Sequence, residues 1–166
     1  MRSALAVTAA ILGALVSLSL ALREASPPED LLLPTIQDFV VVDYLRIEQD
    51  NDPKFPGPRP VHVLAADTVR VFARTRGIER LDVLVQLSGT ESFGVFSGRP
   101  DRNGLVHIEV KVPAGGSRHD FRVPGPEGKR RPGQVQPRTV FMLQPAGYVA
   151  EGIGISGNAV WVRLEE

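Results

Sequence analysis

Three histidines are the side chains of this sequence best suited to metal binding or acid–base chemistry. His62, His107 and His119 are far apart in the chain and show none of the short spacings typical of zinc ligands. Alternation within their predicted strands places His107 on an outer face and His119 on an inner face. We therefore expect structural or exposed histidines. A small envelope metal carrier or enzyme using them is kept as an alternative function.

A nucleophilic enzyme would need an activated serine or cysteine. The run Gly154-Ile155-Ser156-Gly157 is one residue short of the G-x-S-x-G pattern, and no helical sequence follows it. The chain has no cysteine, which excludes disulfides, thiol catalysis and a blue-copper site. The sequence thus predicts a protein that is not an enzyme and that has no cofactor and no metal.

Clusters of charge have simpler interpretations than ligand sites. Glu48, Asp50 and Asp52 lack the glycine that a calcium loop needs at its sixth position. Lys129, Arg130 and Arg131 form the longest basic run, in a chain with 19 basic and 19 acidic residues. Three charges are too few for useful nucleic-acid affinity in salt. We expect solvated loops, with contact to a protein partner or the envelope surface as the alternative for the basic run.

The N-terminal segment targets a membrane. Residues 4–22 carry no charge and follow Arg2, and they just reach the length of a bilayer-spanning helix. Ser19 and Ala21 also fit the small-residue sites of a signal peptide cleaved after Ala21. Both interpretations place residues 23–35, as a linker, and residues 36–166, as a folded domain, outside the cytoplasm. The protein is then either a single-pass membrane protein or a secreted one.

The domain has the alternating pattern of an all-β fold. The expected strands are 36–48, 67–74, 79–88, 91–98, 105–112, 118–123, 138–144 and 159–164. In four of them one apolar set faces the core: Val69, Val71, Ala73; Leu81, Val83, Val85, Leu87; Val106, Ile108, Val110, Val112; Val160, Val162, Leu164. Seven or eight strands with many turns predict an antiparallel sandwich after one hydrophobic helix.

Turn residues suggest how the strands connect. Arg76-Gly77 predicts a hairpin between 67–74 and 79–88, and Asn103-Gly104 predicts a second between 91–98 and 105–112. Proline-rich 50–60 and 124–137 read as loops, and 147–157 as a glycine-rich connection. Strand 36–48 fits no single alternating register, which indicates a bulge or bend.

Residues 67–123 resemble bacterial immunoglobulin-like domains of the invasin/intimin and macroglobulin type. The resemblance is carried by Asp67-Thr68-Val69-Arg70-Val71, Val83-Leu84-Val85-Gln86-Leu87, the turn Asp101-Arg102-Asn103-Gly104 and the stop Val112-Pro113. It implies an immunoglobulin-like sandwich and a spacer, adhesion or docking role in the cell envelope.

Apolar residues on outward faces are the candidate partner-binding residues. They are Phe72, Leu84 and Trp161, to which the basic run Lys129, Arg130 and Arg131 is added. The expected function is a non-catalytic, membrane-tethered, periplasmic or extracellular module that docks to a protein partner. An accessory subunit of a larger membrane complex is the alternative within the same class.

Overall fold

The computed structural model describes residues 33–51, 57–87, 91–122, 130–150, 152 and 154–165. The chain divides into two compact units, Met1–Leu33 and Pro34–Glu166, and the fold below is that of the second. The N-terminal helix expected from the sequence, and nearly all of the predicted linker, lie outside the described residues. Within those residues no helix is long and apolar enough to cross a membrane.

The described residues form an all-β fold, as predicted. The strands are β1 (Thr35–Val41), β2 (Arg46–Asp50), β3 (Arg59–Leu64), β4 (Thr68–Arg76), β5 (Arg80–Leu87), β6 (Glu91–Gly98), β7 (Leu105–Lys111), β8 (Arg118–Arg122), β9 (Arg130–Gln134), β10 (Phe141–Tyr148), β11 (Gly154–Ser156) and β12 (Val160–Leu164). The number of strands in the described residues exceeds the seven or eight predicted from the sequence.

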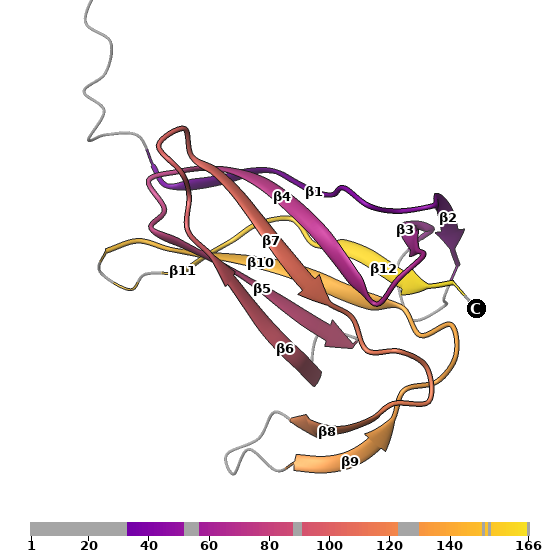
Figure 1. The fold of residues 1–166 in the computed structure, drawn as a ribbon. Helices are drawn as coiled ribbons and strands as arrows, with labels where there is room; N and C mark the ends of the chain where they lie inside the picture. Colours follow the sequence, from indigo (N-terminus) through magenta and orange to yellow (C-terminus); the bar gives the residue numbers. More distant parts are fainter. Residues whose placement is uncertain are drawn as a thin grey trace, which may run out of the picture. The chain divides into compact units, whose positions relative to one another are not determined.

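Two sheets face each other in a sandwich-like arrangement (Figure 1). The smaller has the order β1-β4-β7, and the larger has the order β2-β3-β12-β10-β5-β6, with β11 added beside β10. Strands β8 and β9 form a separate two-stranded arm that extends from the sandwich. The described pairs are antiparallel except β3–β12, which is parallel.

The core lies between the two sheets and consists mainly of valine and leucine. Residues that share one side of β4, β5 and β7 are almost fully buried: Val69, Val71, Ala73, Leu81, Val83, Val85, Val106, Ile108 and Val110. Phe141, Leu143 and Val162 complete it from β10 and β12. The predicted inner faces are thus confirmed except at Leu87, which is only partly buried and lies outside the core cluster. They follow from the alternation of side chains between a buried and an open face.

Both predicted hairpins are wrong. Strand β4 pairs with β1 and β7, whereas β5 pairs with β10 and β6, so Gly77 carries the chain from one sheet to the other. Likewise the Asn103-Gly104 turn joins β6 of the larger sheet to β7 of the smaller. The consecutive pair in the middle of the chain is β5–β6. Turn residues fix a reversal of direction, but they do not say whether the two strands share a sheet.

Other segments also differ from expectation. The apolar run 36–48, predicted as one strand, is two strands, while the predicted bulge is present in β1 between Gln37 and Val40. The region 124–137, predicted to be a loop, contains β9, where Pro132 is tolerated because the arm has only two strands. Strand β3 was not predicted, and β10 and β11 occupy much of the glycine-rich connection.

Candidate interaction surface at the β1–β2 edge

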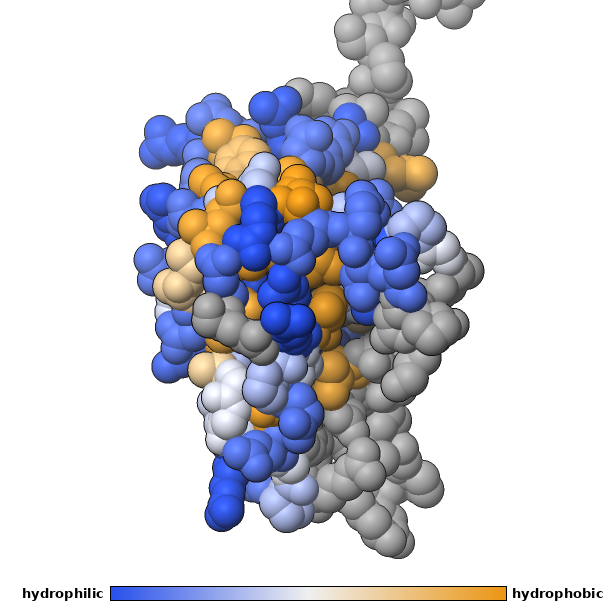
Figure 2. Space-filling model, turned by 90° about the vertical axis from the view of Figure 1, so that its right-hand side faces the viewer, coloured by the Kyte–Doolittle hydropathy of each residue, from blue (hydrophilic) through white to orange (hydrophobic). Residues whose placement is uncertain are grey.

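Large apolar side chains are exposed mainly along one short segment. Among the described residues, five of the seven that combine bulk, hydrophobicity and exposure lie between positions 40 and 47: Val40, Val42, Tyr44, Leu45 and Ile47. Each is between 43% and 51% exposed. We call these five residues the edge surface. Figure 2 looks at the side of the molecule that bears β2, where apolar groups lie between charged ones.

The edge surface forms where the chain passes from one sheet to the other. Val42 N donates to Arg70 O on β4 at 2.9 Å, which ends the pairing with the smaller sheet. Leu45 N donates to Val63 O on β3 at 2.8 Å, which begins the pairing with the larger sheet. The backbone is therefore fixed on both sides of the crossing, and the apolar side chains are presented on an ordered frame.

An ion pair holds the crossing itself. The Arg70 guanidinium donates two hydrogen bonds to the Asp43 carboxylate, at 2.6 and 2.9 Å. This bidentate contact lowers the pKa of Asp43 below its ordinary value, chiefly through the side-chain hydrogen bonds from Arg70. Asp43 is the acidic residue between Val42 and Tyr44, so its charge is held beside the edge surface and directed onto β4.

The two faces of β2 and β3 differ in what covers them. Val61 and Val63 are fully buried, yet neither belongs to the core cluster between the sheets. The register places Val61 beside Glu48 and Trp161. These valines thus lie on the outer face, covered by charged and aromatic side chains.

On the opposite face β2 lacks such a cover. Ile47 pairs with His62, whose ring packs edge-on against Tyr44 at a centroid distance of 4.8 Å. No described residue of β2 belongs to the core cluster. The larger sheet therefore extends past the core at β2, and Ile47 remains about half exposed on the side where a core would be expected.

An ion-pair network lines the outer face of the same strands. Arg46 donates to Glu48 at 2.7 Å and to Glu165 at 2.5 Å, and Arg163 also donates to Glu48. Hydrogen bonds from Arg163 and then from Arg46 lower the pKa of Glu48, and those to Glu165 and Glu48 raise the pKa of Arg46. The charged side chains of this face pair with one another, in contrast to the apolar edge surface.

Phe72 adjoins the edge surface, and the other two candidate aromatic or aliphatic residues do not. Phe72 lies opposite Val40 in the β1–β4 register, and its ring is 5.0 Å from that of His107. Leu84 is on the larger sheet, opposite Val95 and Gln144. The three residues predicted from the sequence therefore occupy two different sheets.

Trp161 is covered by its own chain. The Arg59 guanidinium lies over the indole ring, 4.1 Å from its centroid. Arg59 also donates to the Asp50 carboxylate at 2.7 and 2.5 Å, and only 11% of its side chain is exposed. A partner would have to displace this arginine to reach that face of the ring. Trp161 is thus part of the structure of the outer face.

The basic run lies partly outside the described residues. Lys129 is not among them, and Arg130 and Arg131 begin β9, opposite Arg122 and Phe121 of β8. Arg130 and Arg131 are therefore on the arm, away from the strands that form the edge surface in Figure 1.

The histidines do not meet. His62 contacts Tyr44, His107 contacts Phe72, and His119 packs edge-on against Phe93 at 5.6 Å. Within the described ranges no group of three histidine, aspartate or glutamate side chains could hold a metal ion. Each described histidine ring instead has an aromatic neighbour.

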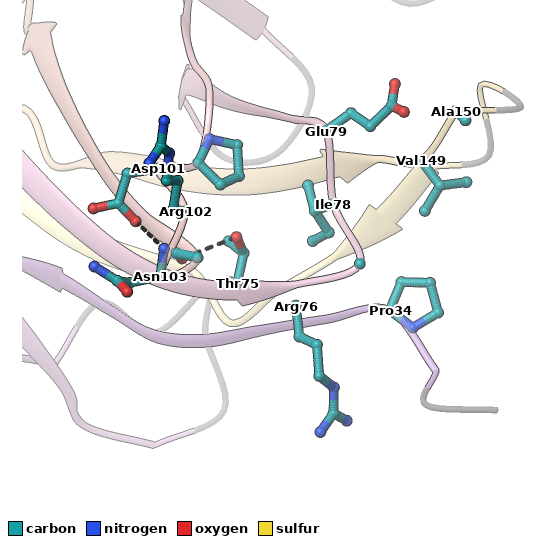
Figure 3. Close-up of a pocket in the computed structure, with 13 residues that line it drawn as sticks. Pro34, Thr75, Arg76, Ile78, Glu79, Asp101, Arg102, Asn103, Val149 and Ala150 are labelled. Carbon is teal, nitrogen blue, oxygen red and sulfur yellow. Dashed lines mark hydrogen bonds between the residues drawn. The ribbon is translucent and has the colours of Figure 1, made fainter. Parts of the chain in front are cut away.

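A cleft lies among the loops at one end of the sandwich. It has a volume of about 730 Å³ and is bordered by Pro34, Ile78 and the 100–104 turn (Figure 3). The Asp101 carboxylate accepts hydrogen bonds from the backbone N–H groups of Asn103 and Leu105, at 2.7 and 2.9 Å. The Asp101 carboxylate is thus occupied in forming the turn, which favours a structural role for Asp101.

The chain was also compared with known proteins. No protein-family model, no curated protein and no solved structure matches it. Its function is therefore inferred from the edge surface, the fold and the N-terminal sequence.

Proposed function

We propose that this protein is a non-catalytic, membrane-tethered module whose immunoglobulin-like β-sandwich lies outside the cytoplasm and binds a protein partner through the edge surface. The observation that carries the proposal is the gathering of five exposed large apolar side chains on one eight-residue segment. Large apolar side chains that are exposed close together are a feature of interaction sites in soluble domains.

The frame of the edge surface supports a binding role. Backbone hydrogen bonds on both sides of the crossing and the Arg70–Asp43 ion pair restrict its conformation. A preordered surface loses less conformational entropy when a partner binds. An accessory subunit of a larger membrane complex would use the same surface.

The immunoglobulin-like arrangement is supported by the path of the chain. The connections β4–β5 and β6–β7 cross between the two sheets, while β5–β6 is a hairpin within one sheet. Such crossing connections between two facing sheets are typical of immunoglobulin-like sandwiches.

The tether is tested by the intact mass of the protein recovered from its native membranes. A mass that includes residues 1–22 supports a permanent anchor. A mass that begins at Leu22 replaces the anchor with a secreted domain.

The binding surface is tested by photo-crosslinking, for which the two tyrosines of the chain form a matched pair. Tyr44 belongs to the edge surface, whereas Tyr148 packs under Arg80, whose guanidinium lies 4.5 Å from the ring centroid. A benzophenone amino acid at position 44 should give a discrete adduct in membranes, and Ile47→Glu should abolish it. Equal adducts from positions 44 and 148, or none, would contradict the proposal.

A further inference from the structure

We infer that the protein partner is a second copy of this chain, whose β2 pairs antiparallel with β2 of the first about a two-fold axis at Ile47. The inference depends on the proposed function only in taking the edge surface as the binding surface. It combines the open edge of β2, the direction of its backbone groups and its pattern of charge.

Strand β2 has an open edge. It is the outermost strand of the larger sheet and pairs with β3 alone among the described strands. The unpaired side of an edge strand presents N–H and C=O groups to which another strand can bond. Two exposed apolar side chains lie along this strand: Ile47 within β2 and Leu45 directly before it.

The backbone groups at the open edge can be identified. Val63 O accepts from Leu45 N, while the register places Val63 opposite Arg46, so two residues face one in a β-bulge. Backbone groups of successive strand residues point to opposite neighbours. Since Arg46 and Glu48 thus direct theirs toward β3, Ile47 directs its N–H and C=O toward the open edge.

A two-fold axis at Ile47 makes β2 complementary to itself. Ile47 of each copy then exchanges both backbone hydrogen bonds with Ile47 of the other. Arg46 lies opposite Glu48 of the second copy, twice, and Leu45 lies opposite Gln49. Opposite charges in facing positions stabilise a strand pair, and they extend the ion-pair network already formed on that face.

Two-fold registers with the axis at Arg46 or at Glu48 are disfavoured by charge. With the axis at Glu48, the two Glu48 carboxylates would be directly opposite, and like charges in that position destabilise the pair. Charge complementarity therefore selects Ile47 as the axis.

A pair of five-residue strands buries little surface. Such an interface is expected to be weak between free molecules. Two tethered copies share one membrane, and this confinement raises their effective concentration. The dimer should accordingly form in the membrane more readily than in dilute detergent.

Single cysteines in this cysteine-free chain test the inference. Facing residues that exchange both hydrogen bonds have Cα atoms about 5.5 Å apart, within disulfide range. Ile47→Cys in the full chain, in native membranes with a mild oxidant, should give a disulfide-linked dimer. Val95→Cys is the matched control, because Val95 is similarly exposed on β6, the opposite edge of the same sheet.

Glu48→Cys tests the register. With the axis at Ile47, the two positions 48 are displaced by about 7 Å along the strands, which puts them beyond disulfide range. Ile47→Cys should crosslink about tenfold faster than either Val95→Cys or Glu48→Cys. Equal rates, or faster reaction of Glu48→Cys, would overturn the inference.

The two proposals fail in different ways. A photo-adduct at position 44 whose mass is that of another protein, without an Ile47→Cys dimer, removes the second copy and leaves the binding function. Absence of both adduct and dimer removes both. A photo-adduct of twice the chain's mass together with the disulfide supports both.

Discussion

Thr75 and Gly104 tie together two of the corners at which the chain changes sheets. Thr75 N donates to Gly104 O at 2.7 Å, and Thr75 Oγ1 donates to the same oxygen at 3.1 Å. Thr75 ends the buried part of β4, and Gly104 precedes β7. The contact thus joins the β4–β5 corner to the β6–β7 corner and fixes how both strands leave their sheets.

Gly104→Ala should be strongly destabilising. Gly104 has a φ of +75°, and a Cβ there would lie 2.1 Å from Thr75 O. Gly152 has the same φ with open space around it, so Gly152→Ala measures the backbone cost alone. We expect about 1–2 kcal/mol for Gly152→Ala, and about 1–3 kcal/mol more for Gly104→Ala. Urea denaturation measures both, and equal losses would contradict the close approach.

Arg59→Ala should uncover Trp161. The chain has one tryptophan, so its fluorescence reports this site alone. Loss of the guanidinium over the ring should red-shift the emission, increase acrylamide quenching and cost about 1–2 kcal/mol of stability. Arg80→Ala removes a similar stacking contact from Tyr148 and should leave the emission unchanged. Unchanged quenching in Arg59→Ala would show that the arginine does not shield the ring.

The buried faces of the strands could be predicted from the sequence, because period-two alternation is a local property. Val69, Val71 and Ala73 show it clearly, and all three are buried. Which strands are neighbours in a sheet could not be predicted in this way. The parallel pair of Val61 with Trp161 joins residues about a hundred positions apart, and no local pattern encodes it.

The edge surface could not be recognised in advance for a related reason. Val40, Val42 and Ile47 belong to an apolar run that reads as a buried strand. Val40 and Val42 flank the buried Val41, so they face outward from the smaller sheet. Ile47 is exposed because the larger sheet extends beyond the core at β2. Of the partner-binding residues predicted from the sequence, Phe72 lies nearest to the edge surface, since it pairs with Val40 between β4 and β1.

His119→Ala should loosen the β8–β9 arm. The His119 ring packs on Phe93, which packs edge-on against core residue Phe141 at 5.2 Å. Removing the imidazole should speed amide hydrogen exchange in β8 and β9 and leave β5 and β10 protected. His107→Ala removes a histidine that also contacts a phenylalanine, but on β7, and should leave the arm unchanged. Unaltered exchange in His119→Ala would mean that other contacts hold the arm.

Glu48 should make part of the stability depend on pH. Arg163 and Arg46 lower its pKa below the ordinary value of 4.5 in the folded chain. A carboxyl whose pKa is lower in the folded state contributes stability above pH 4.5, and this is lost as the pH falls through the folded pKa.

Glu48→Gln should therefore be less stable than the unaltered chain near neutral pH, and the difference should shrink in acid. Urea midpoints at about pH 7 and about pH 3 measure this change. The same substitution at exposed Glu79, on the β4–β5 corner, controls for the general effect of removing a carboxylate. A gap between Glu48→Gln and the unaltered chain that is equally large at both pH values would mean that the Glu48 charge does not stabilise the β2–β3–β12 face.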